Sequence, residues 1–210
     1  MSYAVKEIFL SLQGEGAQVG RPAVFCRFAG CNLWSGLEQD RAAADCQFCD
    51  TGFVGGERFE TADKLAAAAH SLWPGKGGPE SGENPLAACT GGEPFLQLDE
   101  KLINAFHGAG FQVAAETNGT LPAPDGLDWL CVSPKAKTKL VVIRGDELKL
   151  VFPQEGAEPE LYQSLDFQNF FLQPMDGPDK EKNTELALSY CLAHPKWRLS
   201  LQTQKILGIK

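Results

Sequence analysis

Seven short apolar segments recur along the chain and predict the strands of a buried sheet. Most of them are nearly continuous in apolar character rather than alternating with polar residues, which is typical of parallel strands covered on both faces. The segments are residues 23–28, 86–90, 112–116, 129–133, 147–152, 169–173 and 197–202.

Helical patterns of apolar positions lie between several of these strands. Helices are predicted over residues 61–73, which begin at a capping Thr61, and over residues 98–109 and 184–192. Strands that alternate with helices favour a mostly parallel α/β sheet. About six such units fit this length, whereas a complete eightfold barrel usually takes about 250 residues. We therefore expect an incomplete, abbreviated (β/α)6-type partial barrel.

Two polar segments interrupt the alternation without ending it. Residues 32–45 are predicted to form a loop, and residues 74–85, PGKGGPESGENP, are predicted to form a mobile one. Because strands and helices continue on both sides, neither segment is expected to be a domain linker. Residues 1–210 are expected to form a single domain.

Composition and charge narrow the possible functions. Hydrophobic residues make up 43% of the chain, enough for a sizeable core, and the formal net charge is −8. This charge argues against a protein that binds nucleic acid through bulk electrostatics. No apolar run approaches the roughly 18–20 residues of a membrane span, and the N-terminal residues do not resemble a signal peptide. We expect a cytoplasmic protein with neither nucleic acid nor a membrane as its partner.

Three of the seven cysteines have a spacing that suits a metal centre. Cys31, Cys46 and Cys49 form a C-x14-C-x2-C pattern, and clustered cysteines in a reducing compartment favour metal or redox chemistry. A four-cysteine zinc site would need Cys26, which lies in the apolar segment AVFCRF and is expected to pack in the core. Three ligands fit an iron–sulfur cluster with one open iron, and an open zinc position is the alternative.

The remaining cysteines and histidines do not suggest a second site. We interpret the cysteines as core thiols: Cys89, Cys131 and Cys191. The histidines lie in or next to predicted helices and are interpreted as structural or exposed: His70, His107 and His194.

Several motifs together resemble those of one enzyme family. They are the N-terminal EIFLSLQGEGAQVGRPAVFCRFAGCNL, the turn CQFCDT, TGGEP, ETNGT, SPK and the C-terminal LSLQTQKILGI. The chain resembles the 7-carboxy-7-deazaguanine synthases of the queuosine and deazapurine pathway, a family of radical S-adenosylmethionine enzymes. The superfamily usually has a much shorter spacing between its first two cysteines, and the long insertion here is similar to that of this family. The resemblance implies the partial barrel of the superfamily with a modified cluster-binding loop.

The resemblance also implies which residues hold the cofactors. Cys31, Cys46 and Cys49 would bind a 4Fe–4S cluster as the catalytic centre, S-adenosylmethionine would bind its open iron, and Thr51 would bind Mg²⁺. The implied S-adenosylmethionine contacts are Phe48, Cys49, Asp50, Gly92, Glu93, Glu116, Asn118, Ser133, Pro134, Lys135, Gln173, Pro174, Met175 and Asp176. Some have plainer interpretations, because the glycines and Asn118 also suit turns, Met175 suits a core position, and Thr51 suits a cap.

A second set of residues is implied to bind a pterin substrate. The set is Leu12, Gln13, Gly14, Glu15, Gly16, Arg27, Thr90 and Lys210. Arg27 lies in an apolar segment, where its charge needs either the substrate carboxylate or an internal Asp or Glu as a partner. The main chain of Lys210 is the implied contact, through an α-carboxylate facing the N–H edge of the pterin, and a chain end that only packs on the barrel is the alternative. Gln204 stands where some relatives have histidine, so its role stays open.

The implied reaction converts 6-carboxy-5,6,7,8-tetrahydropterin to 7-carboxy-7-deazaguanine. A 5′-deoxyadenosyl radical would remove hydrogen from C6, and ring contraction with loss of ammonia would follow. A homodimer and a flavodoxin-type reductant are implied with it. The alternatives are another radical enzyme of the superfamily, such as an activase that installs a glycyl radical, and a zinc or redox module without catalysis.

Overall fold

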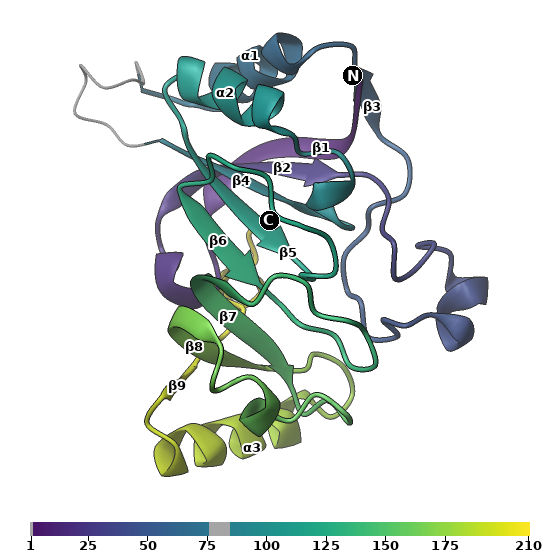
Figure 1. Cartoon of the computed structure of the whole chain (residues 1–210), viewed down its shortest axis with the longest axis vertical. Coiled ribbons are helices and arrows are strands. Elements are labelled where there is room, and N and C mark those ends of the chain that lie inside the picture. The colour runs from purple at the N-terminus through teal and green to yellow at the C-terminus, as the bar shows by residue number, and fades with distance from the viewer. Residues whose placement is uncertain (1, 76–84) are drawn as a thin grey trace.

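A computed structural model describes residues 2–75 and 85–210 of the chain. Most of the predicted mobile loop, residues 76–84, lies outside the described residues. Within the described part, nine strands form one sheet in the order β3-β1-β2-β4-β5-β6-β7-β8-β9 (Figure 1). The strands are β1 (Tyr3–Leu12), β2 (Pro22–Phe28), β3 (Glu57–Phe59), β4 (Leu86–Gly91), β5 (Gln112–Thr117), β6 (Trp129–Val132), β7 (Arg144–Phe152), β8 (Asp166–Pro174) and β9 (Trp197–Leu199).

Most of the sheet is parallel, as the continuous apolar segments predicted. Strands β2 and β4 to β9 pair in parallel with their neighbours, whereas β1 pairs antiparallel with both β2 and β3. Parallel strands place their carboxyl ends at the same edge of a sheet, where the connecting loops meet. This edge is therefore the expected position of a site.

Three of the four α-helices in the described residues cover the sheet. Helices α1 (Ala62–Leu72) and α2 (Glu100–Gly108) pack together over the first strands, and α3 (Lys180–Ala193) packs on β8 and β9 (Figure 1). The connections from β5 to β8 contain no α-helix, so the barrel is abbreviated in its helices as well as in its length. The predicted cap at Thr61 is present, since its side chain accepts a hydrogen bond from the Lys64 amide.

Some elements differ from the prediction. Strand β1 was not predicted because its exposure alternates along an antiparallel strand next to the sheet edge, whereas the prediction relied on continuous apolar runs. The predicted strand over residues 197–202 ends at Leu199, and the short helix α4 (Thr203–Leu207) follows it. Helix α3 begins at Lys180, before the predicted residue 184. Its first three residues are charged and exposed, so they added nothing to the apolar pattern on which the prediction relied.

The core surrounds the thiols that were predicted to be structural. Cys26 and Cys89 are fully buried and lie opposite each other on β2 and β4, and burial raises the pKa of both thiols. Cys131 is buried too, which confirms the expected packing, whereas Cys191 on α3 is only partly buried. No helix in the described part of the chain is long and apolar enough to cross a membrane.

We expect Phe106→Ala on α2 to lower the free energy of unfolding by about 3–5 kcal/mol. Phe106 is fully buried between the sheet and Phe111, so its removal leaves a cavity that the sheet cannot fill. Denaturant unfolding would measure the change. Leu192→Ala on α3 is the control, because Leu192 is 77% exposed and its loss should change stability by less than about 0.5 kcal/mol. Equal losses in the two variants would contradict this assignment of the core.

Candidate active site

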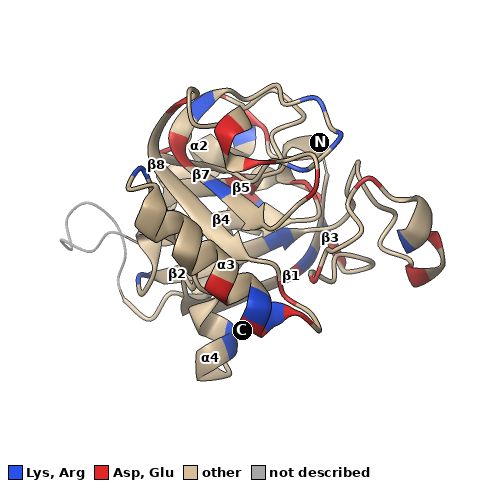
Figure 2. Cartoon of the chain, turned by 90° about the horizontal axis from the view of Figure 1, so that it is seen from below, with Lys and Arg blue, Asp and Glu red and all other residues tan. Residues whose placement is uncertain are grey.

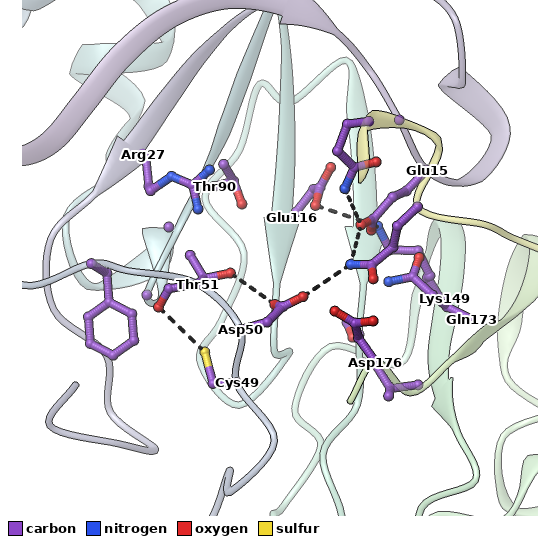
Figure 3. Close-up of a pocket in the computed structure, with 18 of the residues that line it drawn as sticks. Glu15, Arg27, Cys49, Asp50, Thr51, Thr90, Glu116, Lys149, Gln173 and Asp176 are labelled. Carbon is purple, nitrogen blue, oxygen red and sulfur yellow. Dashed lines mark hydrogen bonds and ion pairs between the residues drawn. The ribbon is translucent and has the colours of Figure 1, made fainter. Parts of the chain in front are cut away.

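A cavity of about 390 Å³ opens at the carboxyl edge of the parallel strands. It receives residues from the ends of β2, β4, β5, β7 and β8, from the loop after β1, and from the C-terminal segment (Figure 3). The predicted site residues that line it are Leu12, Gln13, Gly14, Glu15, Arg27, Cys31, Cys46, Phe48, Cys49, Asp50, Thr51, Thr90, Gly92, Glu116, Asn118, Ser133, Lys135, Gln173, Pro174, Met175, Asp176 and Lys210.

Three thiols come from the loop between β2 and β3 and line this one cavity. The neighbouring Cys46 thiol is the main cause that lowers the pKa of Cys49 to about 6. The described residues contain no group of three or more His, Cys, Asp or Glu side chains that could hold a single metal ion. In a 4Fe–4S cluster each thiolate binds an iron of its own, so the ligands surround the cluster rather than one ion. Three converging thiols without a fourth fit that donor set.

The long insertion supports the turn that carries two of these thiols. The Arg41 guanidinium group stacks on the Trp34 ring, with its carbon 4.1 Å from the ring centroid. One of its terminal nitrogens donates hydrogen bonds to the carbonyls of Gln47 and Cys49, at 2.9 and 3.1 Å. Arg41 therefore holds the backbone on both sides of Phe48, and with it the direction of the Cys46 and Cys49 side chains.

The TGGEP segment forms the wall next to the thiols. A Cβ atom on Gly92 would lie only 1.9 Å from the Gly30 carbonyl oxygen, so only glycine allows this close approach. Glu93 is fully buried behind the wall, and its carboxylate accepts hydrogen bonds from the Thr117 hydroxyl and the Asn118 amide. The side chain of Glu93 therefore joins the ends of β4 and β5 and does not reach the cavity.

The ends of the later strands supply polar groups to the same wall. Lys135 donates to the carbonyl and the hydroxyl oxygen of Ser133, both at 2.7 Å, and burial lowers the pKa of its ammonium group. Asp176 lies next to Lys205, which also pairs with Asp50 in the CQFCDT turn. Basic and acidic residues accordingly lie side by side around α4 and the C-terminus in Figure 2.

The loop after β1 is held by buried charge pairs and amides. The Glu15 carboxylate pairs with Lys149 on β7, at 2.5 Å, and accepts hydrogen bonds from the amides of Gln202 and Gln204. Burial alone would raise the pKa of Glu15, but the Lys149 charge lowers it to about 2, so the group is ionised at neutral pH. The amide oxygen of Gln204 is buried in this lining and has no hydrogen-bond partner within the described residues.

Arg27 lies on the other side of the cavity, next to Thr90 (Figure 3). Its Nε atom is 3.1 Å from Glu7, so the internal carboxylate considered from the sequence is present. Glu7 also pairs with the Lys210 side chain, which lowers the pKa of the Glu7 carboxyl. The Ser11 hydroxyl donates to the main-chain oxygen of Lys210 at 2.6 Å, so this part of the chain is docked against β1.

The sequence aligns over its full length with those of known enzymes that all carry the same name. The 7-carboxy-7-deazaguanine synthase of Caulobacter vibrioides is 62% identical over 214 residues, and that of Bacteroides thetaiotaomicron is 42% identical over 210 residues, with each chain covered completely.

The chain belongs to the 7-carboxy-7-deazaguanine synthase family.

The fold agrees with this assignment to the synthase family. The crystal structure of QueE from Escherichia coli superposes with a TM-score of 0.70 at 26% identity, covering 96% of this chain and 94% of that one. No family model matches the sequence. The likeness over nearly the whole length of both chains confirms the expected partial barrel.

Three predicted site residues of this synthase do not line the cavity. They are Gly16, Glu93 and Pro134. Gly16 has a positive φ of 66°, and a Cβ atom there would lie 1.9 Å from a Glu147 carboxylate oxygen, so it shapes the substrate loop from behind. Pro134 instead presents its carbonyl to the Gln154 side chain.

Several cavity residues of the synthase were missed from the sequence. They include Phe9, Phe25, Lys149, Gln202 and Lys205. The signal for Lys149 was present, because it is a charge inside the apolar segment ELKLVF and resembles Arg27 in VFCRF. The other residues had no such signal. Phe9 and Phe25 are ordinary strand residues of β1 and β2, and Gln202 and Lys205 are of types that are common on any protein surface.

We expect Arg41→Lys to loosen the turn over residues 46–51. Lysine cannot make the flat stack on Trp34 or bind two carbonyls from one planar group, so local opening of the turn should become about tenfold more frequent. Amide hydrogen exchange of residues 46–51 would measure this. Arg58→Lys on β3, bonded to Ser2 and outside the cavity lining, should leave that exchange unchanged. Unchanged exchange in both variants would contradict the role of Arg41.

Proposed function

We propose that the protein converts 6-carboxy-5,6,7,8-tetrahydropterin to 7-carboxy-7-deazaguanine with loss of ammonia, as a radical S-adenosylmethionine enzyme. One observation carries this proposal: three separate features line the same cavity. They are the three thiols, the wall formed by the TGGEP segment and the strand ends, and the glutamine and glutamate side chains of the loop after β1. When bound, the 4Fe–4S cluster and S-adenosylmethionine would supply a 5′-deoxyadenosyl radical for hydrogen abstraction at C6. The residues below bind and orient the reactants around that chemistry.

Cys31, Cys46 and Cys49 would hold the cluster, and the iron without a thiolate ligand would be available to bind S-adenosylmethionine. The close backbone approach at Gly92 and the polar groups of Asn118, Ser133 and Asp176 would bind the cofactor along the strand ends. Cys26 supports this donor set, because it is fully buried beside Cys89 and so does not offer a fourth ligand.

The substrate ring would lie against the loop after β1. Glu15 is an ionised acceptor, the Gln13 side-chain oxygen accepts from the Glu15 amide, and the Gln204 amide oxygen has no hydrogen-bond partner within the described residues, so this side of the cavity is rich in acceptor oxygens. A pterin ring edge presents several N–H donors, which such a set would satisfy. The Arg27 guanidinium group would bind the substrate carboxylate across the cavity, because among the described residues Glu7 lies 3.1 Å from its Nε atom without an aligned hydrogen bond.

Mg²⁺ would bind beside the cluster loop through Thr51. Thr51 lines the cavity directly after Cys49 and Asp50, and its hydroxyl lies 3.4 Å from an Asp50 carboxylate oxygen. Mg²⁺ keeps several waters and needs few protein ligands, so one hydroxyl and a substrate carboxylate would be sufficient. We further propose a flavodoxin-type reductant as the electron donor and a homodimer as the assembled state.

Anaerobic reconstitution tests the proposed function most directly. The reconstituted protein would be incubated with the carboxy-tetrahydropterin, S-adenosylmethionine, Mg²⁺ and a reductant, and the product would be identified by mass spectrometry. Formation of 7-carboxy-7-deazaguanine, lost in EDTA, is expected. Zinc without acid-labile sulfide in anaerobically purified protein, or no product from a fully loaded cluster, would overturn the proposal.

We expect Cys31→Ala, Cys46→Ala and Cys49→Ala each to abolish product formation and to lower the iron content after reconstitution. Three ligands leave no spare thiolate, so the loss of any one exposes a second iron. Cys89→Ala is the matched control, because its thiol is fully buried in β4 away from the cavity. Half the iron in the Cys89 variant would show that the three thiols are not the ligand set.

We expect Arg27→Lys to weaken binding of the pterin substrate by at least about 100-fold and to leave S-adenosylmethionine binding nearly unchanged. The figure follows from the loss of a bidentate carboxylate contact in a largely desolvated site, about 3 kcal/mol. Titration calorimetry would measure both affinities. Glu7→Gln removes the internal partner and keeps Arg27, so its substrate affinity should stay within about fivefold. A larger loss for Glu7→Gln than for Arg27→Lys would assign Arg27 to the internal pair alone.

A further inference from the structure

Lys149 is a buried cation in the lining of the cavity. It lies in the middle of β7 between Leu148 and Leu150, and its side chain is only 6% exposed. A lysine is almost never this buried unless it is paired, so its partners should explain its presence.

The partners of Lys149 belong to two different parts of the site. Its ammonium nitrogen is 2.5 Å from Glu15 in the loop after β1 and 3.5 Å from Glu116 at the end of β5. Gln13 donates a hydrogen bond to the other oxygen of Glu116, at 2.7 Å, so the loop also reaches β5 directly. Figure 3 shows Glu15, Glu116 and Lys149 together at one end of the cavity.

Several carboxylates surround the one Lys149 ammonium group. Glu15, Glu116 and Glu147 all face its ammonium group, and their charges raise its pKa well above the ordinary value although burial alone would lower it. Burial raises the pKa of Glu147, whereas Lys149 keeps Glu15 ionised. Removal of this one cation would leave the Glu15 and Glu116 carboxylates as neighbours of like charge in a partly buried lining, where they would repel each other.

We infer that Lys149 is a positioning residue that couples the substrate side of the cavity to the cofactor side, by fixing Glu15 and Glu116 from one rigid strand. The inference rests on the proposed function, in which Glu15 binds the pterin ring and Glu116 contacts S-adenosylmethionine. Lys149 itself has its charge satisfied by these carboxylates, so it acts through them and does not touch the reacting atoms. A strand position suits this role, because the backbone of β7 is held on both sides by parallel neighbours.

Calorimetric titration of the reconstituted protein without reductant separates this role from the chemistry, since no turnover takes place. Lys149→Met should weaken both pterin and S-adenosylmethionine binding by at least tenfold. Glu15→Gln should weaken pterin binding selectively, and Glu116→Gln should weaken S-adenosylmethionine binding selectively. Lys149→Arg, which keeps the charge, should recover part of both affinities.

A double variant distinguishes a loss of positioning from a loss of folding. Lys149→Met combined with Glu15→Gln removes one buried charge of each sign, so its thermal midpoint should lie above that of Lys149→Met alone. Both affinities should stay low in this double variant, because the positioning contact is still absent. The control is Lys196→Met, an exposed lysine near the Phe170 ring and outside the cavity, which should leave both affinities unchanged.

The results distinguish this inference from the proposed function. A parent protein that binds neither the pterin nor S-adenosylmethionine would overturn both. A parent that binds both ligands, with Lys149→Met weakening only one of them or neither, would overturn the coupling alone. Recovery of both affinities in the double variant would also overturn it, since the loss would then come from the unpaired charge.

Discussion

The parallel alignment of β2 and β4 to β9 is the constraint on which the rest of the structure depends. Because parallel strands must be reconnected over the faces of the sheet, their carboxyl ends and the loops that follow lie at one edge. Each strand then contributes its functional side chains just where its buried segment ends, as with Thr90, Glu116 and Gln173. A cavity at that edge collects groups that are far apart in the sequence.

The antiparallel β1 adds a second feature, a loop that is fixed from the far end of the chain. The Thr203 amide and hydroxyl both donate to the Gly14 carbonyl, and Gln204 donates to Glu15. A Cβ atom on Gly14 would lie 1.9 Å from the Gln204 amide oxygen, so glycine permits this contact. The loop proposed to bind the substrate is therefore part of a packed layer that includes the C-terminal segment.

The insertion between the first two cysteines has a physical role in this arrangement. A free loop of this length would leave the CxxC turn without fixed orientation, because a chain without tertiary contacts pays a conformational entropy cost when it is ordered. The stack of Arg41 on Trp34, with Trp34 itself edge-on to Phe53, supplies those contacts. The orientation of the Cys46 and Cys49 thiols thus depends on aromatic packing inside the insertion.

The sequence by itself determined the parallel sheet, the structural thiols and the motifs at the strand ends, because these depend on local apolar runs and on residue types at fixed positions. It also indicated that Arg27 needs a charged partner. Only the tertiary structure decided that Glu7 is that partner, that Glu93 turns behind the wall, and that Lys149 lies between Glu15 and Glu116. The physical reason is that a buried charge is stabilised by whichever opposite charge the register and the loops bring within a few ångströms, and sequence distance does not determine that neighbour.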